Sequence, residues 1–247
     1  MTEVRVALSE EIDRYLGSLV RTGPFANKAE LVRAALVNFA GQAGPMAQGF
    51  DLETCFAPDG RVYQLEYARE AALRGLPGIG IVFDGGVLLA AAPVASAAKV
   101  GGKLVRGPSK IRRVGDRLAL LASGLVADAH MAFLRLQESK PKTTQEALDQ
   151  VVRLYWEHSV DRTKRPLGAG LLLASTLDGD GRLFSIDPSA AYVDQDAAVL
   201  GEGCEERTEI LERRYRRGTA KEAERLALEI LNKPENLEVV RLAADGR

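Results

Sequence analysis

Residues 57–71 read APDGRVYQLEYAREA and place a tight turn directly before a helix. Asp59 and Gly60 supply the turn, because both residue types accept the backbone angles that tight turns need. Residues that form helices well then continue from about residue 61 to residue 74. Gly75 follows in the position that favours a helix end. The stretch therefore predicts one helix over residues 61–74.

Two apolar runs follow this helix, at residues 79–83 and 87–92, on either side of the sequence Asp-Gly-Gly. An Asp-Gly pair between two apolar runs is the strongest short-range signal for a β-hairpin. Further strands are predicted at residues 110–114, 118–122, 171–175, 182–186, 190–194 and 238–242, and further helices at or after Ser123, Thr143, Glu205 and Thr219. Strands in two blocks around a helical pair predict an α+β fold in which helices pack on antiparallel sheets.

The composition is that of a globular protein and excludes several other classes. Of the 247 residues, 46% are hydrophobic, and 33 basic side chains nearly balance 34 acidic ones. This balance gives no overall field that would attract nucleic acid. Two cysteines and two histidines are too few for a zinc site, so neither a metal nor a cofactor is expected. No apolar run approaches the roughly 20 residues that span a bilayer, and no signal sequence is visible, so we expect a cytoplasmic location.

The first forty residues form a pattern of their own. Residues 2–8 alternate between apolar and other side chains, which predicts a short strand. Ser9 then precedes an acidic first turn and an apolar helical stripe that stops near Gly23. Asn27, with Glu30 three residues later, predicts the start of a second helix. We therefore divide the chain into an N-terminal module of residues 1–41, an irregular linker of residues 42–49 and a main domain of residues 50–247.

Four stretches of the main domain resemble motifs of proteasome α-type subunits. Residues 57–71 are similar to the N-terminal signature of that family, and Ser123–Ala129 resembles the motif that opens its first core helix. Arg165–Gly168 and Asp187–Ser189 are similar to two further motifs of the family. Each motif alone would fit an ordinary turn or cap, but together and in this order they favour the family. The resemblance implies that residues 50–247 form the four-layer αββα sandwich of N-terminal-nucleophile hydrolases, assembled as a ring.

The same resemblance implies a subunit that is not itself an enzyme. Proteolytic members of this fold use an N-terminal threonine at the start of the strand before the Asp-Gly-Gly hairpin. The corresponding residue here is Leu76, and the acidic residue of the second strand is replaced by Ala92 or Pro93. We expect a noncatalytic outer-ring subunit that gates the path of unfolded substrates. Its implied partners are further copies of the chain, β-type proteasome subunits and a hexameric ATPase activator.

The functional positions of the family fall on six residues of this sequence. Lys110 corresponds to the lysine that receives the C-terminal carboxylate of the activator, and Gly124 borders the same pocket between subunits. Taken alone, Lys110 would be read as a solvated lysine at a strand end, and it is the resemblance that favours carboxylate binding. The cluster that keeps the axial pore ordered corresponds to Phe50, Asp51, Pro58 and Tyr67. Phe50 stands where the family usually has tyrosine, so one hydroxyl group of that cluster is missing.

The N-terminal module resembles the ribbon-helix-helix fold of small dimeric DNA-binding regulators. Its strand cannot bury its apolar face alone, so we expect it to pair with the same strand of a second subunit. Reading DNA would need outward side chains that contact bases, and Arg5 is the one basic candidate, offset by Glu3. We therefore favour a dimerisation or gate module, and nucleic acid is not an expected partner. Two alternatives stay open: a DNA-binding regulator with a proteasome-like oligomerisation body, and a stand-alone α-like ring without a protease partner.

Overall fold

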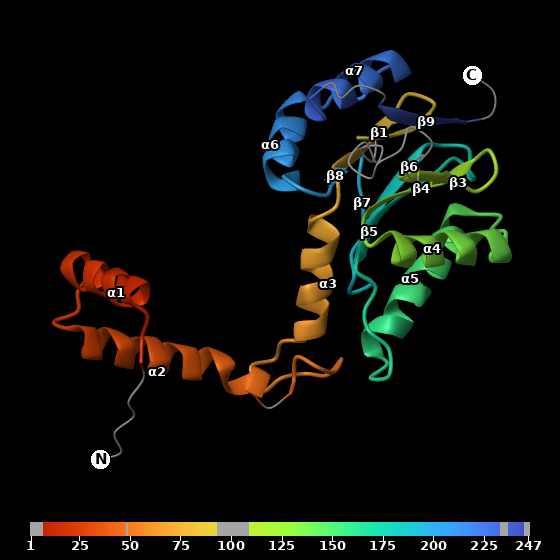
Figure 1. Ribbon diagram of the computed structural model, residues 1–247. Coiled ribbons are helices and arrows are strands. Elements are labelled where there is room, and N and C mark those ends of the chain that lie inside the picture. The colour runs from red at the N-terminus through yellow and green to blue at the C-terminus, as the bar shows by residue number, and fades with distance from the viewer. Residues whose placement is uncertain (1–6, 48, 93–108, 233–236, 245–247) are drawn as a thin grey trace, which may run out of the picture.

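The computed structural model describes residues 7–47, 49–92, 109–232 and 237–244, and its body stacks two antiparallel sheets between helices (Figure 1). The helices are α1 (Glu10–Thr22), α2 (Lys28–Ala47), α3 (Tyr63–Leu73), α4 (Val126–Ser139), α5 (Thr144–Val160), α6 (Cys204–Arg214) and α7 (Ala220–Ile230). The strands are β1 (Gly78–Phe83), β2 (Gly86–Ala91), β3 (Ile111–Arg113), β4 (Leu118–Gly124), β5 (Ala169–Ser175), β6 (Arg182–Ile186), β7 (Tyr192–Asp194), β8 (Ala197–Leu200) and β9 (Glu238–Ala243). These elements confirm the α+β class. Within the described ranges, no helix is long and apolar enough to cross a membrane.

The predicted β-hairpin forms the centre of the smaller sheet. Strands β1 and β2 pair antiparallel from Gly78 opposite Ala91 to Phe83 opposite Gly86. Gly85 in the turn has φ +84°, a conformation that glycine adopts without strain. Strand β8 pairs with β1 and strand β9 with β2, which gives the order β8-β1-β2-β9. The larger sheet has the order β3-β4-β5-β6-β7, and its neighbouring strands are also antiparallel.

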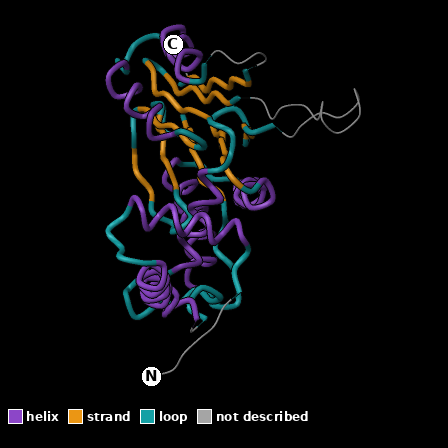
Figure 2. The backbone as a smooth tube through the Cα atoms, turned by 60° about the vertical axis from the view of Figure 1, so that its left-hand side comes forward, coloured by secondary structure: helices purple, strands orange, loops and turns teal. Residues whose placement is uncertain are grey.

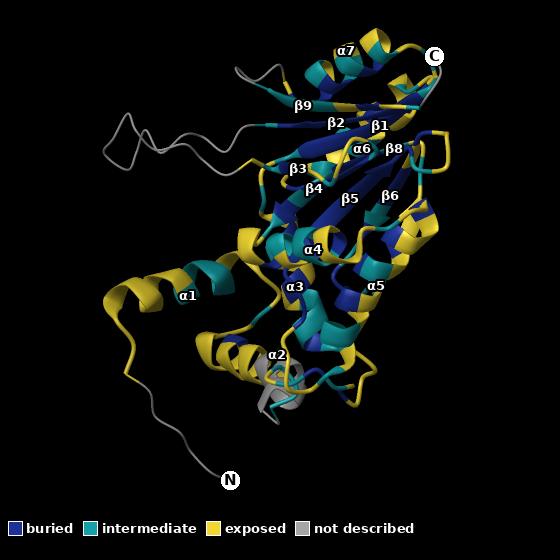
Figure 3. Ribbon diagram, turned by 90° about the vertical axis from the view of Figure 1, so that its right-hand side faces the viewer, coloured by how far each residue is buried: buried dark blue, intermediate teal, exposed yellow. Residues whose placement is uncertain are grey.

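Three apolar clusters hold the layers of the body together. The central cluster lies between the two sheets and includes Leu89 and Leu172, both fully buried. A second cluster, around Leu136, packs α4 and α5 on the larger sheet. The third, around Leu211, packs α6 and α7 on the smaller sheet. The body is therefore a four-layer αββα sandwich, in which the strands lie between helices (Figure 2). The strands β1, β2 and β5 are buried along their whole length (Figure 3).

The structure corrects one prediction about the sheets and adds one strand that was not predicted. Ser123 does not cap a helix, because it lies in β4 opposite Gly170, and α4 begins only at Val126. Its hydroxyl group donates instead to the carbonyl oxygen of Ala72 at 2.7 Å. Strand β8 was not predicted, because its four residues are too few to show a clear alternation. In both cases pairing with a distant strand decided the local structure.

The N-terminal module is a helical hairpin that lies beside the body (Figures 1 and 3). The Ser9 hydroxyl accepts a hydrogen bond from the backbone N–H of residue 12 at 3.4 Å, which confirms the predicted cap of α1. Asn27 caps α2 in the same way, through the N–H of Glu30 at 2.9 Å. The predicted strand of residues 2–8 lies almost wholly outside the described residues, and so does Arg5. The ribbon-helix-helix resemblance therefore stays a prediction.

The stretch expected to be an irregular linker is helical for most of its length. Helix α2 continues through Gly41 and Pro45 to Ala47. A proline removes one helical hydrogen bond, but the alanines and glutamine around it favour helix, and an established helix extends at one new bond per residue. The expectation of irregular structure at residues 42–47 is thus wrong, while the three domain boundaries stay predictions.

Candidate functional site

Helix α3, which carries part of the 57–71 stretch, is fastened to the body by two other sequence motifs. The Arg69 guanidinium donates to the Asp187 carboxylate at 2.8 Å and to the Ser189 hydroxyl at 3.0 Å. At the end of the helix, the Ala72 carbonyl accepts the hydrogen bond from Ser123. Motifs up to 120 residues apart in the sequence therefore meet at α3.

The motif Arg165–Gly168 is held by a buried carboxylate in α4. Asp128 is 4% exposed and accepts hydrogen bonds from the Arg165 guanidinium at 2.6 and 2.8 Å and from the Gly168 N–H at 2.7 Å. Burial alone would raise the pKa of Asp128, but the hydrogen bonds from Arg165 and Gly168 outweigh it and lower the pKa below its usual value. The ionised carboxylate thus fixes residues 165–168 against the start of α4.

Two glycines let the chain after α3 pass directly against the end of β4. A Cβ atom on Gly75 would lie 2.3 Å from the backbone nitrogen of Gly124, and one on Gly124 would lie 2.3 Å from the carbonyl oxygen of Gly168. Gly124 also has φ +103°, where other residues are strained. A larger residue at either position would push these segments apart.

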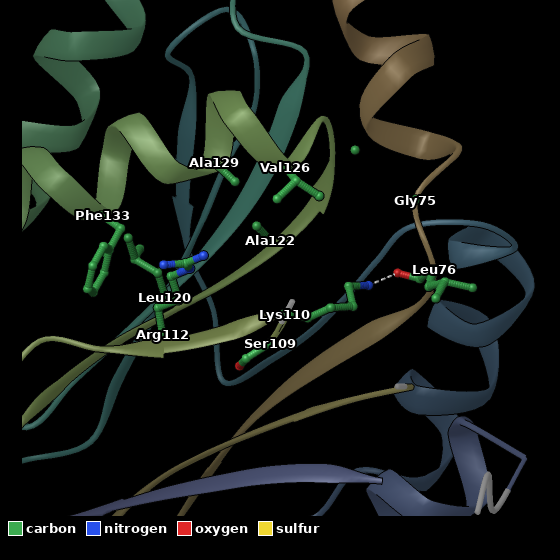
Figure 4. Close-up of a pocket in the computed structure, with 11 residues that line it drawn as sticks. Gly75, Leu76, Ser109, Lys110, Arg112, Leu120, Ala122, Val126, Ala129 and Phe133 are labelled. Atoms are coloured by element: carbon green, nitrogen blue, oxygen red, sulfur yellow. Dashed lines mark hydrogen bonds between the residues drawn. The ribbon is translucent and has the colours of Figure 1, made fainter. Parts of the chain in front are cut away.

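A cavity of about 190 Å³ opens beside these glycines, between the segment before β3, the start of α4 and the chain before β1. Apolar side chains form most of its wall, namely Leu76, Leu120, Ala122, Val126, Ala129 and Phe133. The Lys110 side chain extends along it, and its ammonium group donates to the carbonyl oxygen of Leu76 (Figure 4). Gly124 lines the same cavity. The structure thus brings together the two residues that the sequence assigned to activator binding.

Glu238, the first residue of β9, holds the segment that carries Lys110. Its carboxylate accepts hydrogen bonds from the N–H of Lys110 at 3.0 Å, from the N–H of Ile111 at 3.3 Å and from the Ser109 hydroxyl. Burial lowers the pKa of the Lys110 ammonium to about 8, although the negative charge of Glu238 opposes this shift. Sequence reasoning missed Glu238, because no local pattern indicates a contact between residues 128 positions apart.

The four residues assigned to the pore turn lie before and on α3. Phe50 and Asp51 are partly buried, Pro58 is exposed, and Tyr67 on α3 is 42% exposed. The carbonyl oxygen of Asp51 accepts a hydrogen bond from the Gln64 side chain. The Asp51 carboxylate and the Tyr67 hydroxyl form no hydrogen bond with a described residue of this chain. The structure does not join the four side chains by hydrogen bonds, and their role in a pore stays a prediction.

The turn before α3 is ordered by Asp59, which the site assignment did not include. Its carboxylate accepts hydrogen bonds from the Tyr63 hydroxyl at 2.7 Å and from the Arg61 N–H at 3.1 Å. These two bonds lower the pKa of Asp59, so the turn keeps its negative charge. The sequence did contain a signal for the bond between Asp59 and the Arg61 N–H, because an aspartate in a turn commonly accepts a hydrogen bond from the backbone two residues later.

The cysteines lie away from this cavity. Cys55 and Cys204 are free thiols, and neither is among the residues that line the cavity around Lys110. In the part of the chain that the structure describes, no three His, Cys, Asp or Glu side chains are grouped so that they could hold a metal ion. The cavity offers the Lys110 ammonium group, the Arg112 guanidinium group and mostly apolar walls, an arrangement that suits a carboxylate attached to an apolar group.

Comparison with known proteins identifies the family. A family model described as proteasome subunit matches residues 73–237. The proteasome subunit alpha of Methanocaldococcus jannaschii is 35% identical to this chain over 75% of the chain and 76% of the relative. The proteins of the same name from Thermococcus sibiricus and Archaeoglobus fulgidus are 34% and 33% identical, over 79% and 78% of this chain and 80% and 84% of the relatives. This chain therefore belongs to the proteasome subunit family, and within it to the α type.

Proposed function

We propose that this chain is a noncatalytic α subunit of a proteasome-like core particle. In this function it forms the outer ring with copies of itself, caps a ring of β-type subunits and controls how unfolded proteins reach the axial pore. Relatives named proteasome subunit alpha, aligned over three quarters or more of the chain, support the assignment. They do not favour the two alternatives, a DNA-binding regulator and a stand-alone ring. A cytoplasmic location is part of the proposal.

The surroundings of Lys110 support a role in binding an activator. An ammonium group has three N–H donors, and the described acceptor is the single carbonyl oxygen of Leu76, so donors remain for a carboxylate. Most of the cavity wall is apolar, with Val126 and Ala129 among its side chains, and a charge pair is stronger in such surroundings than in water. Arg112, which lies 5.2 Å over the Phe133 ring, adds a second positive charge to the lining. We infer that the C-terminal carboxylate of a hexameric ATPase subunit binds to Lys110 beside Gly124.

The position of Leu76 supports the absence of catalysis. Leu76 lies directly before β1, has no hydroxyl group, and is joined through Gly75 to α3, so its nitrogen is a peptide nitrogen and not a free amine. The purified chain is expected to leave fluorogenic peptides uncleaved. Stoichiometric labelling by a threonine-directed covalent inhibitor would contradict this expectation.

The N-terminal hairpin supports pairing between subunits. No residue of α1 is buried, and Ile12 is 48% exposed and Tyr15 63% exposed. Part of the apolar face of this amphipathic helix is therefore left exposed, and the same hairpin of a second subunit offers a matching surface that would cover it. Because Phe50 and Asp51 follow α2 closely, we propose that paired hairpins also influence the pore turn.

Docking of a hexameric ATPase to the assembled particle tests the activator site. Lys110→Ala removes a charged hydrogen bond, so docking is expected to weaken about ten- to a hundredfold. Lys142→Ala is the matched control, because Lys142 is an exposed lysine that does not line the cavity. Native mass spectrometry should show the same ring mass for both variants. Equal docking by wild type and Lys110→Ala would reject the role of Lys110, whereas failure of the wild-type chain to assemble with a β-type subunit would reject the α-subunit function.

A further inference from the structure

A second cavity lies where the turn between α6 and α7 meets strand β1. These three elements lie in the upper part of Figure 1. Its volume is about 290 Å³, and it shares no lining residue with the cavity around Lys110. Ile81, Val82 and Phe83 of β1 line it on one side, and Leu226 of α7 lines it on another. Nothing in the proposed function uses this cavity.

The segment above this cavity concentrates positive charge. Residues 213–225 contain six basic side chains and two acidic ones, in a chain whose totals are 33 and 34. Four arginines line the cavity, against two glutamates: Arg214, Arg216, Arg217 and Arg225, with Glu222 and Glu229. The lining therefore carries an excess of positive charge.

The two glutamates are already engaged. Glu229 forms an ion pair with Arg214. Glu222 belongs to the capping box of α7, where its carboxylate accepts hydrogen bonds from the N–H of Thr219 at 2.8 Å and from the Thr219 hydroxyl at 2.9 Å. Both interactions of Thr219 lower the pKa of Glu222, with a smaller effect from the charge of Arg225. Neither glutamate forms an ion pair with Arg216, Arg217 or Arg225.

The remaining three arginines form few polar contacts through their side chains. Among the described residues, Arg216 donates to the backbone carbonyl oxygens of Arg213 and Tyr215, and Arg225 forms neither a hydrogen bond nor an ion pair. Arg217 reaches the carboxylate of Asp84 at 3.5 Å, with both side chains more than half exposed. Three guanidinium groups around one cavity thus keep most of their donors for another acceptor.

We propose that this cavity binds a small molecule that carries phosphate groups. Guanidinium groups form paired hydrogen bonds with phosphate oxygens, and a tetrahedral phosphate can accept from several guanidinium groups at once, whereas a carboxylate offers two oxygens in one plane. The volume lies near the lower end of the range for ligand sites, which suits one or two phosphate groups with a small organic part. The apolar side of the cavity, at Phe83 and Leu226, would contact that organic part.

Calorimetric titration of the full chain with pyrophosphate, in the assembly it forms and at a fixed salt concentration, tests the site. We expect one pyrophosphate per chain. The double variant Arg216→Gln/Arg225→Gln removes two charged donors and should bind at least about tenfold more weakly. Arg213→Gln is the matched control, because Arg213 is 73% exposed, pairs with Glu209 at 3.0 Å and does not line the cavity. It should bind within about twofold of wild type.

Three outcomes of these titrations would overturn the phosphate site. Binding of equal strength in wild type and the double variant, or no binding by wild type at millimolar pyrophosphate, overturns the site. An equal loss in Arg213→Gln also overturns it, since the effect would then be one of overall charge. Citrate tests the ligand class, because a tricarboxylate that binds as tightly as pyrophosphate removes the preference for phosphate. If the double variant fails to fold, Arg225→Lys takes its place in the titration. This variant keeps the charge but loses the paired donors, so its affinity for pyrophosphate should lie between those of wild type and a chain without the site.

Discussion

The body and the N-terminal hairpin begin their helices with the same local signals but differ in what covers them. Thr219 caps α7 as Ser9 caps α1, each through the backbone N–H three residues later. Helices α3 to α7 of the body all bury side chains, while α1 buries none. The difference teaches that local sequence is sufficient to specify a helix, whereas tertiary packing supplies most of its stability.

The two regions also differ in the reach of their polar contacts. In the body, Arg69 meets Asp187 across 118 residues and Asp128 meets Arg165 across 37. In the hairpin, the ion pair between Lys28 and Asp13 spans 15 residues and both side chains are more than 40% exposed. Long-range contacts couple the layers of the body into one unit, and the hairpin is expected to behave as a separate local unit.

The largest expected difference is in the cost of removing one leucine. Leu172→Ala empties part of the cluster between the sheets and should lower the free energy of unfolding by about 2–5 kcal/mol. Leu36→Ala, at a side chain 61% exposed on α2, should change it by less than about 0.5 kcal/mol. Urea unfolding followed by circular dichroism measures both values. A loss above 2 kcal/mol in Leu36→Ala would mean that the hairpin is as well covered as the body.

The second comparison is between the carboxylates of the two regions. Asp128→Asn leaves Arg165 without its charged acceptor and should cost about 2–3 kcal/mol, because the lost hydrogen bonds involve charged groups and the carboxylate is buried. Asp13→Asn in the hairpin breaks an exposed pair and should cost less than about 1 kcal/mol. Both values come from urea unfolding at pH 7.

The dependence on pH has a definite sign for Asp128. Its pKa is lower in the folded protein than in the unfolded chain, so the ionised carboxylate stabilises the fold fully above the unfolded pKa. That contribution is lost as the pH falls through the folded pKa. The difference between wild type and Asp128→Asn should therefore shrink in acid. A difference that stays constant from pH 7 to pH 2 would mean that the charge of Asp128 contributes nothing to stability.

Most elements of the body, though not strand β8, could be predicted because their signals are local. Asp84 and Gly85 between two apolar runs predicted the β1–β2 hairpin, and the Thr-x-x-Glu pattern at Thr219 predicted the capping box of α7. Ser123 was assigned wrongly because serine is a common helix cap, and nothing near it shows that β4 continues. Pairing with Gly170 on β5 decides its structure, and that information lies far away in the sequence.

The candidate site could be predicted only where a family motif carried it. Lys110 and Gly124 were placed in one pocket by resemblance, and the structure puts both in one cavity. Glu238, which holds the backbone of Lys110, has no motif of its own. The arginines around the second cavity form a charge run in the sequence, but their convergence over β1 depends on how α6 and α7 fold onto the sheet. Side-chain convergence of this kind is set by tertiary packing.

A third comparison concerns the lysines of the two regions and rests on the proposed activator site. The pKa of Lys110 is lowered to about 8, so its ammonium group loses its proton as the pH rises through that value and cannot then pair with a carboxylate. Docking of the ATPase is expected to weaken by up to about tenfold per pH unit above pH 8. Lys110→Arg should remove this dependence, because a guanidinium group stays charged. Lys28→Ala should keep the wild-type profile, and a flat wild-type profile between pH 6.5 and pH 9.5 would contradict the role of Lys110.

The smallest expected effect is at the helix caps, and it tests most directly whether the two regions unfold separately. Thr219→Ala removes a capping box from a helix packed on the smaller sheet, so it should lower the free energy of unfolding of the whole body by about 1 kcal/mol. Ser9→Ala removes an equivalent cap from α1, but no residue of α1 is buried, so the loss should stay local. Hydrogen exchange should show the amides of α1 exchanging about fivefold faster in Ser9→Ala, with the urea midpoint of the body unchanged. A shift of that midpoint as large as the one from Thr219→Ala would mean that hairpin and body form a single cooperative unit, and the contrast between them would then lie in exposure alone.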